Sequence, residues 1–201
     1  TTDTRVGLDG VGIIHQTGGQ HTVQGQFQLG RNAGSRGDYE LAEGNLFAAA
    51  QYIGWDGTGS FVQLSGMNRA TAVVALGAGI GSTGSYELHG GSLEAPEVIV
   101  GYQGSSAFHQ LGGDVGISGN LYLGVTAGVT GTYRQSAGVN TVDKLILGER
   151  GIGTYTLDAG TLNVRSIVAG DGRNQAGRGG LELNGGSLNL VQRSMGLHGL
   201  T

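Results

Sequence analysis

Two stretches of the sequence share one pattern: Gly84-Ser85-Tyr86-Glu87-Leu88-His89-Gly90-Gly91-Ser92-Leu93 and Gly153-Thr154-Tyr155-Thr156-Leu157-Asp158-Ala159-Gly160-Thr161-Leu162. In both, a tyrosine precedes a leucine by two positions, a glycine follows three positions later, and a second leucine stands two positions beyond that glycine. Residues two positions apart lie on the same face of a strand. The pattern therefore predicts two short strands joined at a glycine corner.

The pattern belongs to a repeat that extends along the whole sequence. A glycine that closes a short aliphatic strand recurs at intervals of 22 to 26 residues, at Gly7, Gly30, Gly54, Gly77, Gly101, Gly124, Gly148, Gly170 and Gly196. A unit of this size cannot bury its own apolar face, so successive units must stack at the strand spacing of about 4.8 Å. An antiparallel sandwich or propeller also has short strands and glycine turns, but it does not predict columns of like residues.

We therefore predict an all-β fold, a single-stranded parallel β-helix (β-solenoid), with about eight coils of 23 to 24 residues and roughly three short strands per coil. It forms a single domain over residues 1–201, with coils that close near residues 30, 54, 77, 101, 124, 148, 170 and 196. Loop length alternates along the repeat. The longer loops, residues 31–38, 78–85, 125–132 and 171–180, should therefore share one edge of the solenoid.

Two kinds of coil can be recognised from the residues that should face the interior. Leucine coils have leucine on both sides of the glycine corner, as at Leu88 and Leu93, whereas amide coils have glutamine before the corner and usually asparagine or histidine after it. A buried amide without a partner costs about 1 to 3 kcal/mol, so we expect the two polar residues to contact each other across the corner. This interior polar ladder comprises Gln16, His21, Gln63, Asn68, Gln110, Gln135 and Asn140.

Composition excludes several classes of protein. The 43 glycines against one proline indicate many tight turns, and the absence of cysteine leaves no disulfide or thiolate metal site. The net charge is −4, and the charged residues are scattered singly, so they form no basic stripe that could bind nucleic acid. No apolar run is long enough to span a membrane. Because the sequence opens at Thr1, we expect a processed mature chain or a fragment.

The two stretches quoted above resemble the short glycine-rich β-strand repeats of bacterial autotransporter passenger regions. They are also similar to the repeats of large surface proteins that carry a PEP-CTERM-type sorting signal. The resemblance covers essentially the whole chain, and it is a resemblance of repeat style. It implies an exported protein, located outside the cell or on the bacterial cell surface.

The sequence predicts no catalytic, cofactor-binding or metal-binding residues. Asp9 and Asp56 occupy the same loop position two coils apart, roughly 10 Å, which is too far to share a metal ion or a proton. His15 and His109 are predicted to face outward, and His89 and His198 stand alone beside glycines. We therefore expect the chain not to be an enzyme and to need no cofactor.

The leading functional hypothesis is a noncatalytic extracellular structural protein. Its coils would form a rigid rod that self-associates head to tail into a surface filament or matrix fibre, or that acts as an adhesin stalk. The alternative is a carbohydrate-binding surface module that uses Trp55 and Tyr102, which occupy equivalent positions two coils apart. A polysaccharide-cleaving β-helix enzyme is a further alternative. The expected partners are other copies of the chain and, for the adhesive role, extracellular polysaccharide or cell-surface components, but not nucleic acid.

Overall fold

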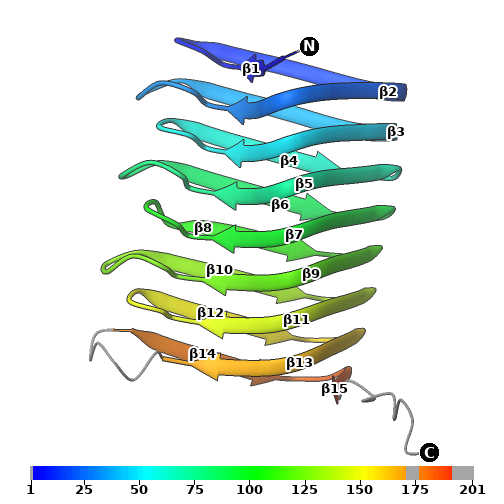
Figure 1. Ribbon diagram of the computed structural model, residues 1–201, viewed down its shortest axis with the longest axis vertical. Helices are drawn as coiled ribbons and strands as arrows, with labels where there is room; N and C mark the ends of the chain where they lie inside the picture. Colours follow the sequence, from blue (N-terminus) through cyan, green and yellow to red (C-terminus); the bar gives the residue numbers. More distant parts are fainter. Residues whose placement is uncertain (1, 171–176, 192–201) are drawn as a thin grey trace, which may run out of the picture.

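The computed structural model describes residues 2–170 and 177–191, and over these residues the chain is a parallel β-solenoid (Figure 1). It has 15 strands and no helix within the described ranges, and every strand pairing is parallel. Successive coils stack along the long axis of the molecule from β1 to β15, as the sequence predicts.

Most coils consist of a short strand, a glycine corner and a longer strand. The short strands pair in one row: β4 (Thr58–Gln63), β6 (Thr83–Leu88), β8 (Ser106–Gln110), β10 (Thr130–Gln135), β12 (Ile152–Leu157) and β14 (Arg178–Leu183). The longer strands pair in a second row: β5 (Met67–Leu76), β7 (Ser92–Val100), β9 (Asp114–Leu123), β11 (Val139–Leu147), β13 (Thr161–Ala169) and β15 (Ser187–Leu190). At the N-terminal end lie β1 (Thr4–Val6) and the long strands β2 (Val11–Leu29) and β3 (Arg36–Ile53), both of which continue through the corner.

The longer strands bend where their register shifts. The pairing between β5 and β7 shifts between Arg69 and Val73, and the pairing between β7 and β9 shifts between Ala95 and Glu97. Such bulges let a strand change direction without ending its ladder. Each of these coils therefore has three straight segments, which agrees with the three short strands expected from the sequence.

The interior is built from columns of equivalent side chains. Six aromatic rings form an unbroken stack, with centroids of consecutive rings 4.6 to 5.2 Å apart and interplanar angles of 5° to 22°: Tyr39, Phe61, Tyr86, Phe108, Tyr133 and Tyr155. All six rings are almost completely buried. Stacking at the strand spacing fixes each ring over the next, so the column is continuous over most of the solenoid.

The loops after the closing glycines lie along one edge (Figure 1). Three of the four longer loops contain the same turn, in which the amide N of Ser35, Ser82 or Val129 donates to the carbonyl oxygen three residues earlier, over 3.0 to 3.2 Å. The fourth longer loop lies partly outside the described residues, as does the coil predicted to close near residue 196.

Candidate functional site

The interior glutamines are buried and held by backbone carbonyl groups. Gln63, at the end of β4, has no exposed surface, and its Nε2 donates to the carbonyl oxygens of Gly66 and Ser92, each over 3.0 Å. Gln110 and Gln135 make the equivalent pair of bonds in their own coils. Each glutamine thus ties its glycine corner to the next coil.

The side-chain oxygen of each glutamine of the polar ladder accepts a hydrogen bond from a tyrosine of the following coil. Tyr86 Oη donates to Gln63 Oε1 over 2.5 Å, and Tyr133 Oη donates to Gln110 Oε1 over 2.7 Å. Gln16 with Tyr39 and Gln135 with Tyr155 repeat the arrangement. Burial raises the pKa of Tyr86 and Tyr133 above the ordinary value of 10.0, so the hydroxyls stay protonated and act as donors.

The tyrosine hydroxyl also joins the two halves of the polar ladder. Asn68 Nδ2 donates to Tyr86 Oη over 3.0 Å, and the Nδ1 atom of His21 lies 3.1 Å from Tyr39 Oη. The predicted direct contact between glutamine and asparagine across the corner is not formed. Instead, the hydrogen bonds of Gln63 go to the backbone and to the hydroxyl, and the hydroxyl oxygen accepts from Asn68.

This role of the tyrosines was not predicted from the sequence, although a correlation between successive coils indicates it. A glutamine in one coil is followed by tyrosine in the aromatic column of the next coil, and a leucine is followed by phenylalanine or leucine. The glutamine pairs are Gln16/Tyr39, Gln63/Tyr86, Gln110/Tyr133 and Gln135/Tyr155, and the leucine pairs are Leu41/Phe61, Leu88/Phe108 and Leu157/Leu181.

One rung of the ladder is incomplete. The Oδ1 atom of Asn140 is buried without a hydrogen-bond partner. In the equivalent rung, Asn68 Oδ1 accepts from Gln51 Nε2 over 2.6 Å. The column that contains Gln51 continues as leucine at Leu121, so the coil before Asn140 offers no donor.

The variant Asn140→Val should therefore stabilise the protein, by up to about 1 kcal/mol, because it removes a buried acceptor that has no donor. It also removes the bond from Asn140 Nδ2 to Tyr155 Oη, but that hydroxyl still donates to Gln135 Oε1. Val115 occupies the same column in the coil before Asn140, where its side chain is buried, so this column already contains a valine.

The matched control is Asn68→Val, which should destabilise the protein because it leaves Gln51 without its partner. Urea unfolding measures the change in the free energy of unfolding for each variant. A change of the same sign in both variants would contradict this explanation.

Trp55 and Tyr102 occupy loops that follow β3 and β7. Trp55 packs edge-on against Tyr52, with ring centroids 4.4 Å apart, and the Arg31 guanidinium lies 4.8 Å from the centre of its ring. Tyr102 is 39% exposed. Ala78 occupies the slot between them, so the two aromatic side chains lie two coils apart, roughly 10 Å.

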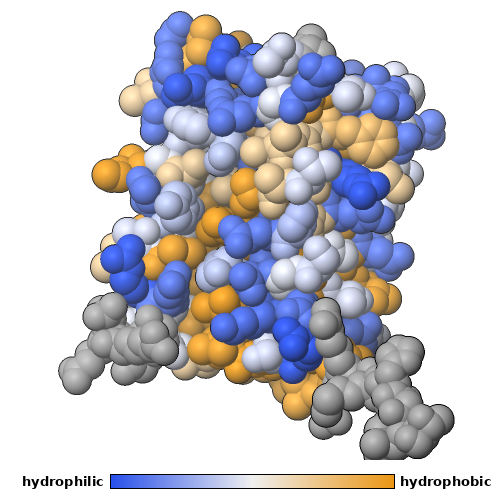
Figure 2. Space-filling view, in the orientation of Figure 1, coloured by the Kyte–Doolittle hydropathy of each residue, from blue (hydrophilic) through white to orange (hydrophobic). Residues whose placement is uncertain are grey.

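An apolar stripe runs beside these two residues on the outer face of the solenoid. The third segments of successive coils present one outward position each, and the strand register aligns them as Tyr52, Ala75, Ile99, Tyr122 and Ile146. Tyr52, Ile99 and Tyr122 are half-buried, whereas Ala75 and Ile146 are covered by their neighbours. Figure 2 views the face formed by the odd-numbered strands, where hydrophobic side chains alternate with hydrophilic ones. Sequence reasoning did not identify this stripe, although these positions lack the polar residues expected of an outward column.

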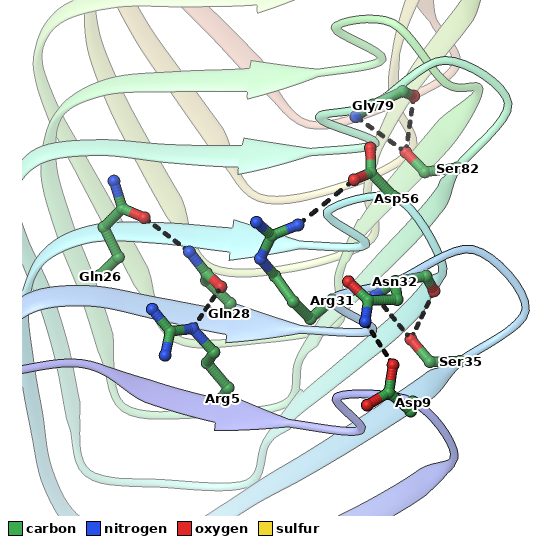
Figure 3. A network of polar contacts seen from close by, with 10 residues as sticks. All are labelled: Arg5, Asp9, Gln26, Gln28, Arg31, Asn32, Ser35, Asp56, Gly79 and Ser82. Carbon is green, nitrogen blue, oxygen red and sulfur yellow. Dashed lines mark hydrogen bonds and ion pairs between the residues drawn. The ribbon is translucent and has the colours of Figure 1, made fainter.

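The loop carboxylates have separate partners (Figure 3). Asn32 donates through Nδ2 to Asp9 Oδ1, and Arg31 donates through its guanidinium to Asp56 Oδ2 over 3.3 Å. Asp9 and Asp56 therefore bond to neighbouring side chains and do not converge on one point. Among the described residues, no group of three or more histidine, aspartate and glutamate side chains is placed to hold a metal ion.

The outward histidines lie beside carboxylates. His15 Nδ1 is 3.5 Å from Glu40 Oε1, and His89 Nε2 is 3.5 Å from Glu87 Oε2. His109 lies outward on β8, and His198 is outside the described residues. These side chains are well exposed, so their ion pairs contribute little to stability.

His21 is the only ionisable residue of the polar ladder. Burial lowers the pKa of His21 below its ordinary value of 6.5, because the charged imidazolium loses hydration beside Phe27, Tyr39 and Thr4. The unfolded chain therefore binds a proton more readily than the folded chain. The free energy of unfolding should have its full value above about pH 6.5 and should decrease as the pH falls below 6.5. Between pH 7 and 5, the Tm of His21→Asn should depend less on pH than the Tm of the unchanged chain. An equal dependence in both proteins would contradict this assignment.

An open groove of about 470 Å³ crosses the outer face of four coils. Its lining includes Arg69 and Glu94, whose charged groups lie 3.8 Å apart, and the hydroxyl-bearing residues Thr71, Ser118 and Thr141. The groove is open to solvent and its charged side chains are about half exposed. It offers hydrogen-bonding groups and one partly exposed pair of opposite charges.

The fold places the chain among the parallel β-solenoid proteins. Comparisons of the chain with protein-family models, with curated proteins and with solved structures found no match. Among the described residues there is also no helix long and apolar enough to cross a membrane.

Proposed function

We propose that the chain is a noncatalytic structural protein, a rigid rod located outside the cell or on the bacterial cell surface. In this proposal the rod self-associates head to tail into a filament or matrix fibre, or serves as an adhesin stalk. The observation that carries the proposal is the interior, in which stacked rings and tyrosine–glutamine hydrogen bonds connect each coil to the next. Such an interior resists bending and shear because no coil can move without breaking contacts on both sides.

The outer charges support the same proposal, because many of them are paired between neighbouring coils. Arg134 Nε lies 2.5 Å from Asp158 Oδ2, and Arg165 Nε lies 2.5 Å from Asp143 Oδ1. These pairs join successive strands of the two rows.

A carbohydrate-binding module is the second candidate function. It is favoured by the exposed ring of Tyr102 beside the apolar stripe, since sugar rings bind on exposed aromatic faces. Affinity electrophoresis against a panel of polysaccharides tests it with Trp55→Ala and Tyr102→Ala. If the polysaccharide retarded both variants as much as the unchanged chain, the carbohydrate-binding proposal would lose its support.

Electron microscopy and sedimentation velocity test the structural proposal. We expect particles whose length increases with protein concentration in steps of one solenoid, and no release of reducing ends from polysaccharides. Short rods of uniform length at high concentration would contradict head-to-tail association. Release of reducing ends that depends on the chain would overturn the noncatalytic assignment.

A further inference from the structure

Gly116 lies inside strand β9, where neither the backbone nor the packing requires a glycine. Its φ is not positive, in contrast to the glycines that close the coils, such as Gly101 and Gly124. Apart from its chain neighbours, the heavy atom nearest to an added Cβ would be the carbonyl oxygen of Leu93, at 4.0 Å, so a side chain would fit there. A glycine inside a strand weakens that strand and often marks the close approach of a ligand. Gly116 therefore leaves a space on the outer face that a ligand could occupy.

This space is part of the groove of about 470 Å³ on the outer face. The strand register aligns one outward column across β5, β7, β9 and β11, which consists of Arg69, Glu94, Gly116 and Thr141. The other three residues have exposed side chains, so the column has a gap between Glu94 and Thr141. Four coils at the strand spacing give the groove a length of roughly 14 Å along the solenoid axis. A ligand that follows the groove is therefore a chain and not a single small ring.

The chemistry of the lining suits an uncharged polar ligand. Arg69 is the only cation of the described lining, and its guanidinium lies 3.8 Å from the carboxylate of Glu94, so the two charges balance. This pair offers donors beside an acceptor, and the exposed hydroxyl groups of Thr71 and Ser118 can both donate and accept. Pro96 adds an exposed apolar surface, against which the C–H groups of a sugar ring can pack.

We infer that this groove binds a neutral saccharide chain, which lies along the solenoid axis with one sugar unit against the gap at Gly116. A peptide is a poorer occupant, because extended peptides add to open sheet edges, and β5, β7, β9 and β11 each pair with a strand on both sides. The groove is a different site from the aromatic pair Trp55 and Tyr102, which are not part of its lining. The inference therefore goes beyond the proposed function and depends neither on head-to-tail association nor on these two rings.

Gly116→Thr tests the inference because it fills the gap without straining the backbone. Its side chain would continue the column into Thr141, and a β-branched residue in place of a strand glycine should raise the Tm by about 1 to 4 °C. The binding probes are four neutral polysaccharides, hydroxyethyl cellulose, laminarin, galactomannan and dextran, and the anionic polysaccharide alginate, all in affinity electrophoresis. At least one neutral polysaccharide should retard the unchanged chain, and its affinity for Gly116→Thr should be at least tenfold lower.

Gly180→Thr is the matched control, because Gly180 is also a strand glycine without a positive φ. An added Cβ at this position would meet only the side chain of Thr154, at 3.8 Å, and β14 belongs to the other row of strands, away from the groove. Gly180→Thr should bind the polysaccharide as the unchanged chain does. Arg69→Ala should weaken binding at least threefold with little change in Tm, because exposed ion pairs contribute little to stability.

Several results would overturn the groove site. They are the absence of retardation by every neutral polysaccharide, retardation by alginate alone, unchanged retardation of Gly116→Thr, and an equal loss in Gly180→Thr. A lower Tm of Gly116→Thr would also overturn it, because packing would then require the glycine. Tyr102→Ala separates the two candidate sites: retardation lost in Tyr102→Ala and kept in Gly116→Thr would assign binding to the aromatic rings, and the reverse pattern would assign it to the groove.

Discussion

Replacing Gly124 by alanine should destabilise the protein by about 2 to 5 kcal/mol, since it combines left-handed backbone strain with overpacking. Gly124 closes a coil with φ of 69°, a conformation that L-residues adopt only with strain. An added Cβ would also overlap the carbonyl oxygen of Ile152, at the start of β12. The neighbouring coil could avoid this overlap only by moving away, which would break the ladder between β10 and β12.

Gly128→Ala is the matched control for this prediction. Gly128 lies four residues further along the same loop with φ of 80°, but no heavy atom lies within 4 Å of the position that its Cβ would take. Its replacement should cost only the conformational strain, about 1 to 2 kcal/mol. Guanidinium unfolding followed by circular dichroism measures both variants. Equal losses would show that the contact between coils is not the reason for glycine at position 124.

Removing the hydroxyl of Tyr133 is the second substitution with a large expected effect. Tyr133→Phe should lower the free energy of unfolding by about 1 to 3 kcal/mol, because Gln110 Oε1 is buried and accepts its hydrogen bond from this hydroxyl. The ring itself remains, and so does its stacking between Phe108 and Tyr155. The loss therefore measures the hydrogen bond and not the packing.

The double variant Gln110→Leu/Tyr133→Phe should recover most of that loss. It converts an amide rung into the leucine rung that the chain already contains at Leu88 and Phe108. Because Val115 stands at the third position of this coil, no other buried polar side chain loses its partner. A double-mutant cycle by urea unfolding gives the coupling energy. If the double variant were as unstable as the sum of the two single variants, the tyrosine–glutamine pair would not act as one unit.

The stacking of coils could be predicted from the sequence because equivalent residues recur at a nearly constant interval. Tyr86, Phe108 and Tyr133 fall into one column by counting alone, and the strand register aligns these residues. The glycine corners and the burial of the leucines follow from the same count. Periodicity is sufficient here because each coil is packed mainly against copies of itself.

The partners within the polar ladder could not be read from the spacing of Gln63 and Asn68. That spacing places both residues beside the glycine corner but gives no direction along the solenoid axis. The hydroxyl that joins them comes from Tyr86, one coil further on, at the tip of a ring whose orientation is set by stacking on Phe61. The missing donor at Asn140 depends likewise on a residue of the preceding coil.

The sequence by itself determined the parallel solenoid, its coil length, its glycine corners and the division into amide and leucine coils, because each of these follows from what recurs at a fixed interval. Only the tertiary structure decided which atoms meet between coils: the tyrosine–glutamine bonds, the partners of Asp9 and Asp56, and the apolar stripe beside Trp55. The physical reason is that hydrogen bonds and ring contacts depend on directions and distances of a few ångströms. A repeat in the sequence specifies which coils are neighbours, and the packed side chains then select the contacts.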